Sequence, residues 1–592
     1  MGLSTATGGA ATGGAATDLM VGAVQRMLPG LRDDGELVDP IFGEPTQYGT
    51  AYFGYVNAAL AVLGRGGPGE HAGAARRCLA ATLRHLLDPS ERPAAAGFSF
   101  DVGSAGYANH RDFMWPAVMR TLRLLQRAGE DVSALSEQVR AVAAPEVFAR
   151  MPPHNWASVW MVGEQARMAA GMSPHASEAM DAWVGAFFSA SADEPEPRAD
   201  VTAGFYREPG LPNSYDLFTR LHLFDLLEEG YTGPHRDMLE RLVRTGLRRS
   251  LGVQLSSGSL ASAHRSTGQL WTLTAQVCFF HRAARRLAGE DGALAARAEQ
   301  AAARAFAAIE AAVRPDGGLS PVENALPAGY RVGYESYTAD AHYVSLALGF
   351  LSTAVLEGFS PAPVLPGAQV AGAFVEPAPL HRALVHADGW SLHVDLAPQP
   401  GYDAFGVADL TLGPGRRLAF GAQVHHGRAG ALRGYGLWGG APLTLGLGLW
   451  DADGALTPLS GLSPEGGVRL GCSGRQLEAQ AELGARRYPY HMRAELAGDR
   501  ARFDEGAGDG RYSLLVPYLR DRGDGTSTEL SWDGGALELR HGRERVAVVC
   551  SRPVERFVHL PYGFESRHGL VGLARLDLAG RGEVGYEVRR AA

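Results

Sequence analysis

The feature that most constrains the fold of this 592-residue chain is a change of hydrophobic period near residue 360. Before this point apolar residues recur at helical spacing. After it, short runs alternate between apolar and polar residues and are bounded by Gly, Asp and Pro clusters. Because helices and strands bury residues with different periods, the two patterns belong to different kinds of element. The sequence therefore predicts an all-α region followed by an all-β region.

Long amphipathic segments separated by Gly and Pro turns fill the first part of the chain. We expect helices over residues 52–63, 74–87, 113–127, 156–170, 179–188, 215–227, 236–248, 271–287, 293–313 and 342–356. About ten helices over roughly 350 residues, joined by short loops, favour an array of α-hairpins. We expect a disordered Gly/Ala/Thr leader over 1–18, a hairpin domain over 19–357, a Pro-rich linker over 358–370 and an antiparallel β-sandwich over 371–592.

Composition excludes several classes of function. The net charge of −9, from 64 acidic and 55 basic residues, argues against a nucleic-acid partner. The chain contains no lysine, which excludes a Schiff-base lysine and the lysine of a phosphate-binding P-loop. The four cysteines are scattered singly, so neither a disulfide framework nor a zinc site is expected. No segment approaches a membrane span or a secretory signal, and we expect a soluble cytoplasmic protein without a membrane partner.

Polar and aromatic side chains gather where loops enter helices. Asn155 and Trp156 open the segment "NWASVWMVGE", where the alternative reading is an N-cap followed by a core tryptophan. In "GFYREPGLPNSYDLF", Tyr215 lies at the mouth of a helix, just after a loop with three polar side chains, Tyr206, Arg207 and Glu208. A tyrosine has a pKa near ~10, so it can act as a base at neutral pH only beside cations that lower this value.

Two further kinds of junction are candidates. His264 and Arg265 precede the helix that begins near Trp271, and an arginine at a helix start suits an anion. The alternative is a polar loop that caps this helix. Other junctions combine aromatic and charged residues, as the walls of carbohydrate clefts do; these are His110 and Arg111, and Tyr334, Glu335 and Tyr337.

The order of these motifs resembles that of the chondroitin and hyaluronate lyases: "NWASVWMVGE", then "DVTAGFYRE" with the tyrosine of "NSYDLF", then "AHRSTGQLW". The resemblance implies an (α/α) toroid followed by antiparallel β-domains, and related bacterial toroid proteins of unassigned function show a similar series. It implies that Asn155, with Arg207 and Arg265, neutralises a substrate carboxylate, that Tyr215 moves the proton and that Arg265 supports Tyr215. The loop that carries the catalytic histidine of those lyases reads "FYRE" here, with Arg207 in the histidine's place. Either His264 substitutes for that histidine, or the chemistry has changed.

The function implied by the resemblance is β-elimination on an acidic oligosaccharide or polysaccharide that contains uronic acid. Tyr215 takes the C5 proton, and the scheme needs neither a cofactor nor a metal. The expected substrate-binding residues are Trp156, Tyr206, Arg207, Glu208, His110, Arg111, Tyr334, Glu335 and Tyr337. One alternative is an inverting glycoside hydrolase, which needs two carboxyl groups about 6.5–9.5 Å apart; Asp112, Asp200, Glu208, Glu335 and Asp340 are available. The other is a carbohydrate-binding protein without catalysis.

Overall fold

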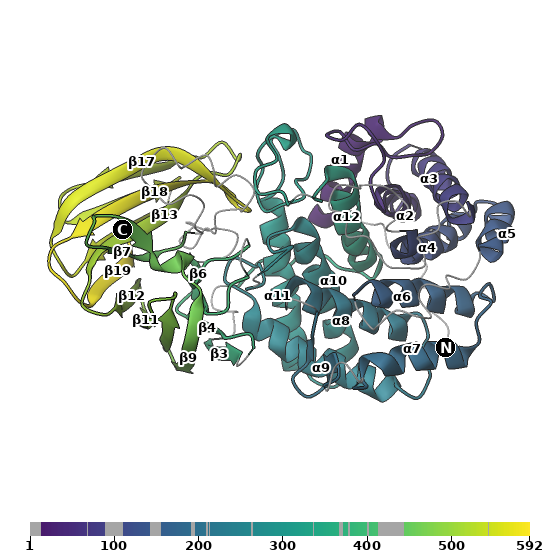
Figure 1. Ribbon diagram of the computed structural model, residues 1–592. Helices are drawn as coiled ribbons and strands as arrows, with labels where there is room; N and C mark the ends of the chain where they lie inside the picture. The colour runs from purple at the N-terminus through teal and green to yellow at the C-terminus, as the bar shows by residue number, and fades with distance from the viewer. Residues whose placement is uncertain are drawn as a thin grey trace.

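The computed structural model describes residues 14–67, 69–88, 111–142, 155–190, 196–208, 211, 213–261, 264–335, 337–365, 371–376, 379–399, 402–412, 443–542 and 544–591. Within these ranges a helical part and a β part lie side by side (Figure 1). The last helix ends at Leu356 and the first strand of the β part begins at Gly372, so the change of fold falls at the change of hydrophobic period.

The helical part consists of α-hairpins. Its helices are α1 (Ala15–Met27), α2 (Gly49–Val62), α3 (Glu70–Leu87), α4 (Trp115–Arg127), α5 (Ser133–Ala141), α6 (Asn155–Ala169), α7 (Ser177–Phe187), α8 (Asn213–Glu228), α9 (Arg236–Val253), α10 (Leu270–Leu287), α11 (Gly292–Glu310) and α12 (Asp340–Leu356). A two-stranded hairpin of β1 (Ala199–Asp200) and β2 (Phe205–Tyr206) lies between α7 and α8.

The even-numbered helices form a closed inner ring. Each contacts the next in the order α2, α4, α6, α8, α10, α12, and α12 returns to α2. Most of them are buried on nearly every side, as α10 is from Leu270 to Ala284, whereas α4 exposes Arg123, Gln126 and Arg127. The odd-numbered helices pack outside and bury one face only, as α9 does while exposing Arg236, Arg241 and Arg248. This arrangement is the predicted (α/α) toroid.

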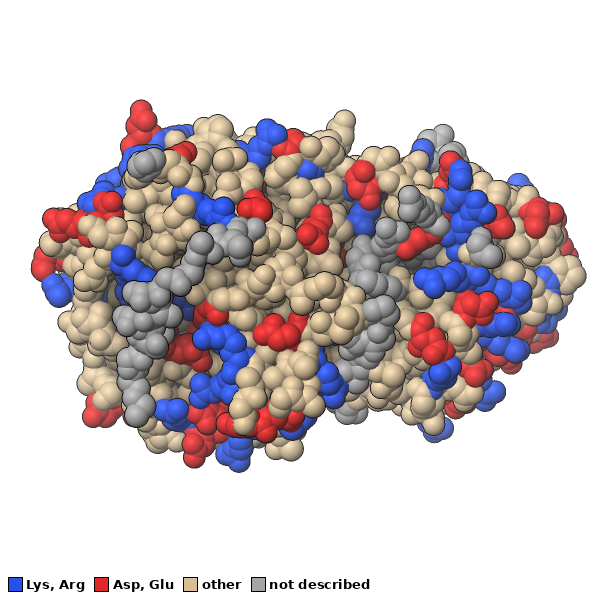
Figure 2. All heavy atoms as spheres, turned by 180° about the vertical axis from the view of Figure 1, so that it is seen from behind, with Lys and Arg blue, Asp and Glu red and all other residues tan. Residues whose placement is uncertain are grey.

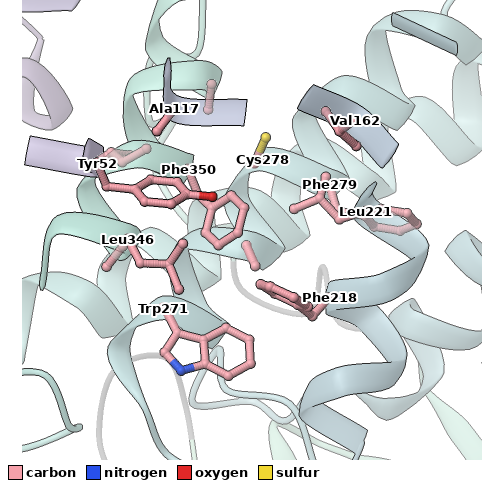
Figure 3. Packing of buried hydrophobic residues seen from close by; sticks show 14 of the residues in the cluster. Tyr52, Ala117, Val162, Phe218, Leu221, Trp271, Cys278, Phe279, Leu346 and Phe350 are labelled. Carbon is pink, nitrogen blue, oxygen red and sulfur yellow. The ribbon is translucent and has the colours of Figure 1, made fainter. Parts of the chain in front are cut away.

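Aromatic side chains fill the middle of the ring. Figure 3 shows Phe218, Trp271 and Phe350 converging from α8, α10 and α12. The ring of Phe218 lies 5.1 Å from that of Trp271 and 5.9 Å from that of Phe350, both edge-on. Edge-to-face contacts suit the charge distribution of aromatic rings. The toroid is therefore a packed barrel, and a site can form only at one of its ends.

The β part is antiparallel throughout. Its strands are β3 (Gly372–Glu376), β4 (Arg382–Ala387), β5 (Trp390–Asp395), β6 (Gly406–Leu412), β7 (Gly446–Trp450), β8 (Leu456–Pro458), β9 (Pro464–Ser473), β10 (Gln476–Leu483), β11 (Tyr488–Ala497), β12 (Arg500–Ala507), β13 (Arg511–Asp521), β14 (Thr528–Trp532), β15 (Ala536–His541), β16 (Glu544–Cys550), β17 (Val554–Ser566), β18 (Gly569–Leu578) and β19 (Val584–Arg590). They form sheets ordered β3-β4-β5-β6, β17-β18-β13-β7-β8 and β14-β15-β16-β19-β12-β11-β10-β9, which share one hydrophobic core.

Hydrogen bonds join the two parts. Ser256, in the loop after α9, donates its backbone N–H to the Ser391 hydroxyl at 2.8 Å. The Arg382 guanidinium donates to the carbonyl of Leu211 at 3.0 Å. On the face displayed in Figure 2, acidic and basic side chains are interspersed, without the broad basic field that a nucleic-acid surface would need.

Two expectations from the sequence need correction. The helix α1 begins at Ala15, inside the segment assigned to a disordered leader, of which residues 1–13 lie outside the described residues. The short helix α5 was missed because its nine residues span little more than two turns, too few for a clear period. Among the described helices none is both long and apolar enough to cross a membrane. All four cysteines are free thiols.

Candidate active site

The site lies where the inner helices begin, at the end of the toroid that touches the β part. Asn155 is the first residue of α6, and Tyr215 lies in the first turn of α8. Residues 264–269 lead into α10, and residues 337–339 lead into α12. Because helix N-termini carry unpaired N–H groups and a partial positive charge, this end of the ring favours an anionic ligand.

The ring of Tyr215 contacts Trp271 and Arg265. Its ring packs against Trp271 at 5.7 Å, and the guanidinium carbon of Arg265 lies 5.2 Å from the ring centroid on a cation–π contact. Burial raises the pKa of the Tyr215 phenol, while the Arg265 charge and a hydrogen bond with Ser266 act in the opposite direction. Tyr215 is therefore a neutral phenol at rest, with a cation placed to stabilise its ionised form.

A chain of hydroxyl groups links Tyr215 to a buried carboxylate. The Tyr215 hydroxyl lies 3.1 Å from Ser266 Oγ, which lies 2.8 Å from the Tyr337 hydroxyl, and Tyr337 donates to Glu335. Since a carboxylate oxygen only accepts, the single proton of each hydroxyl must point towards Glu335. The chain is therefore a directed path along which the Tyr215 proton can reach Glu335.

Glu335 is held by backbone and by the β part. Its Oε1 accepts the Ser266 backbone N–H at 2.6 Å and lies 3.7 Å from the guanidinium of Arg567, in the turn between β17 and β18. Arg567 also donates to the carbonyl of His264 at 3.0 Å. Burial raises the pKa of Glu335, although Arg567 and the Tyr337 hydrogen bond lower it. The β part thus completes the site.

A second buried carboxylate, Glu208, lies on the other side of Arg265. Its Oε1 accepts from Asn155 Nδ2 at 2.5 Å and from Arg265 Nη2 at 3.2 Å, and its Oε2 accepts from the Tyr206 hydroxyl at 2.7 Å. Glu208 is only 5% exposed. Burial raises its pKa, and the hydrogen bonds and Arg265 limit the rise.

Arg207 lies outside this cluster, which corrects the expectation that it takes the place of a catalytic histidine. Its guanidinium forms an ion pair with Glu196, and both side chains are more than a third exposed. Tyr206, at the end of β2, is fully buried, whereas the Arg207 side chain that follows it is 38% exposed. The residue that the fold presents to Asn155 and Arg265 is Glu208.

His264 faces the β part. Its backbone N–H donates to Asp403 Oδ2 at 2.5 Å, and its Nε2 lies 3.1 Å from the Ala397 carbonyl. His264, Asp395 and Asp403 are buried and place one ligand atom each within 4.8 Å of one another, so among the described residues they could hold a cation. Burial raises the pKa of Asp395 to about 7, opposed by the charge of Arg382. The Arg382 guanidinium therefore already balances part of the negative charge of Asp395 and Asp403.

The remaining predicted residues divide between the rim and the scaffold. Trp156 packs on Phe113 with ring centroids 6.4 Å apart. Tyr334 donates to Asp340 at 2.5 Å and accepts from Arg314 at 2.9 Å, so it braces the start of α12. His110 lies outside the described residues, and of Arg111 only the backbone is described, in a 3₁₀ turn before α4.

Sequence reasoning noted Ser266 beside Arg265 without giving it a role, and it missed Arg567. Ser266 has a left-handed backbone, φ +61°, which turns both its N–H and its hydroxyl towards Glu335 and Tyr337. A non-glycine residue with positive φ is uncommon and can be found only in the structure. Arg567 follows Glu335 by more than 200 positions, and no local pattern connects the two.

Comparison with known proteins supports the fold. No family model matches the chain, and no curated protein matches its sequence. The chondroitin AC lyase of Streptomyces coelicolor A3, solved in complex with chondroitin sulphate, aligns with a TM-score of 0.51 at 13% identity over 100% of this chain and 81% of its own. A glycosyl hydrolase of family 88 from Bacteroides vulgatus aligns with a TM-score of 0.39 at 11% identity, over 58% of this chain and 98% of its own.

An α-1,6-mannanase from Salegentibacter sp. HEL1_6 aligns with a TM-score of 0.37 at 13% identity, over 57% of this chain and 99% of its own. The likeness to the chondroitin AC lyase confirms the resemblance for the fold, which by itself does not specify the reaction.

Proposed function

We propose that the chain is a lyase that cleaves uronic-acid-containing glycans by β-elimination. The observation that carries this proposal is the hydrogen-bonded path from Tyr215 to Glu335, together with Arg265 against the Tyr215 ring. β-Elimination needs a strong base at C5 and an acid at the leaving oxygen, and a phenol beside a proton path can be both.

In the proposed reaction Tyr215 passes its proton through Ser266 and Tyr337 to Glu335 and becomes a phenolate stabilised by Arg265. The phenolate takes the C5 proton of the sugar. The electrons of that bond form the C4=C5 double bond while the C4–O bond breaks, and Tyr215 returns the proton to the departing oxygen. Asn155 and Arg265 stabilise the negative charge that develops on the substrate carboxyl group.

The experiment is an absorbance assay on a panel of uronate oligosaccharides. We expect the purified protein to generate the ultraviolet absorbance of a conjugated, unsaturated uronate, and we expect Tyr215→Phe to abolish it. The Tyr55→Phe variant is the matched control, since it also loses one buried tyrosine hydroxyl, which bonds to Thr353 at 2.8 Å in the toroid core. Absorbance that persists in Tyr215→Phe would contradict the role of this residue.

One observation favours a second candidate, an inverting glycoside hydrolase. Glu208 and Glu335 are both buried carboxyl groups with raised pKa values, and both act on Arg265 and Tyr215. A raised pKa is the property that a general acid needs. If reducing ends form without absorbance, and if Glu208→Gln and Glu335→Gln each abolish them while Tyr215→Phe does not, the reaction is hydrolysis.

A further inference from the structure

Asn155 and Arg265, the side chains expected to bind a substrate carboxylate, already bind a carboxylate of the protein itself. Asn155 Nδ2 and Arg265 Nη2 both donate to Glu208 Oε1, at 2.5 and 3.2 Å. Glu208 is only 5% exposed and Asn155 only 4%, whereas the Arg265 side chain is 28% exposed. An incoming uronate must therefore share Asn155 and Arg265 with Glu208.

We propose that an acidic sugar binds here only with uptake of one proton by Glu208, so that the two carboxyl groups share a single negative charge. The proton comes from solvent, and no covalent bond of the sugar changes in this step. Protonated Glu208 becomes a hydrogen-bond donor to the substrate carboxylate, which also receives bonds from Asn155 and Arg265. The inference rests on the proposed function, because it assumes a uronate ligand.

The physical reason is repulsion in a site with little water. Two carboxylates held within hydrogen-bonding distance of the same groups cannot both stay ionised, and the proton affinity of one rises steeply. The charged and titratable groups around Glu208 are Tyr206 with its neighbour Arg198, Arg265 and Tyr215. Arg265 is the cation that contacts Glu208 directly, and it can balance only one of the two carboxylates. Burial has already raised the pKa of Glu208, which lowers the cost of protonation.

The consequence is a pH-dependent affinity that a simple cationic site would not show. In the free protein Glu208 is ionised above its pKa, so binding must add the proton. By linkage, the dissociation constant then rises about tenfold per pH unit above that pKa. The rise ends at the higher pKa that Glu208 has in the complex. A neutral sugar does not compete with Glu208 for charge and binds without proton uptake.

The test is calorimetric binding to Tyr215→Phe, in which turnover is blocked, with a chondroitin tetrasaccharide as the probe. Titrations at a series of pH values, each in two buffers of different ionisation enthalpy, report the protons taken up, and we expect the uptake to approach one per site as the pH rises above the pKa of Glu208 in the free protein. The control ligand is the same tetrasaccharide with its carboxyl groups reduced to alcohols. The control protein is Tyr215→Phe with Glu208→Gln, in which an amide of the same shape donates without titrating.

We expect no proton uptake in the Glu208→Gln protein, and an affinity that no longer changes with pH. Binding of the acidic tetrasaccharide without proton uptake, or equal uptake after Glu208→Gln, overturns the inference and leaves the lyase proposal intact. Binding of the reduced tetrasaccharide alone, or of neither ligand, overturns the uronate assignment and the inference together. Circular dichroism and thermal unfolding show whether each variant is folded.

Discussion

The replacement Tyr337→Phe tests the proton path most directly. The phenyl ring fits the same space, but the hydroxyl that joins Ser266 to Glu335 is lost. Glu335 is 2% exposed and loses one of its donors. A hydrogen bond to a charged group is worth about 1.5–3 kcal/mol, so we expect the free energy of unfolding to fall by about that amount.

The effect on catalysis follows from where the Tyr215 proton can go. In the native protein Glu335 receives it, so the proton path fails when Glu335 itself becomes protonated at acid pH. Since burial raises the pKa of Glu335, this limb lies at higher pH than for an exposed glutamate. Without Tyr337 the Tyr215 proton must leave to solvent. We therefore expect a loss of roughly 10²–10⁴-fold in kcat/KM at neutral pH, the usual contribution of general acid–base groups.

The assay is kcat/KM from about pH 5 to pH 10 on the uronate substrate that the absorbance panel identifies. We expect the ratio of variant to native kcat/KM to increase about tenfold per pH unit towards alkaline pH as solvent ionises Tyr215, because the proton uptake proposed for Glu208 affects both proteins equally. Tyr55→Phe controls for the loss of a buried hydroxyl. A Tyr337→Phe profile parallel to the native one, with any loss the same at every pH, would refute the path and leave Tyr337 a packing residue.

Three further predictions concern residues outside the candidate catalytic groups. A Cβ on Gly333, which has φ +78°, would lie 2.6 Å from the Ser566 carbonyl, so Gly333→Ala should lower stability by about 1–3 kcal/mol in a denaturant titration. Gly329→Ala, whose Cβ meets nothing within 4 Å, is its control. Burial raises the pKa of Glu505 to about 7. The proton bound to Glu505 therefore stabilises the fold fully below the pKa of the unfolded chain, near ~4.3, and this stabilisation is lost as the pH rises through about 7. We expect Glu505→Gln to remove this dependence, roughly 3 kcal/mol, from chemical unfolding measured across that range. Arg207→Ala removes only an exposed ion pair worth about 0–1 kcal/mol and should leave kcat/KM within about twofold of native.

The fold could be predicted because its signal is local. The period of apolar residues differs between helix and strand over any ten residues, so the change of fold near residue 360 can be predicted without knowing which residues are in contact. The helix α1 was hidden because Ala and Thr at its start resemble the leader before it. The sequence predicts only in part which helices line the inner ring. Inner helices such as α12 are apolar on all sides, and outer helices such as α9 are amphipathic.

The candidate site was predicted where its residues lie at helix starts. The structure brings Asn155, Tyr215 and Arg265 together because α6, α8 and α10 are neighbours in the ring and begin at the same end. The sequence did not show that Glu208, and not Arg207, contacts Asn155 and Arg265. The strand that precedes them ends at Tyr206 and is buried at both of its residues, so its alternation does not decide between the two. The contribution of Arg567 depends on how the β part docks, which no local pattern encodes.

The charges of the site suggest why a second carboxylate is tolerated beside the candidate catalytic groups. Arg265 and Arg567 are balanced by Glu208 and Glu335 before any ligand arrives. A buried guanidinium without a partner would be costly, and an internal carboxylate holds Arg265 in place against the Tyr215 ring. Because both arginines are already paired with glutamates, the carboxylate of a bound uronate would add a negative charge that neither arginine balances. Under the proposed proton uptake, Glu208 takes a proton from solvent when a uronate binds, and the pH dependence of that binding is set by Glu208 and not by the sugar.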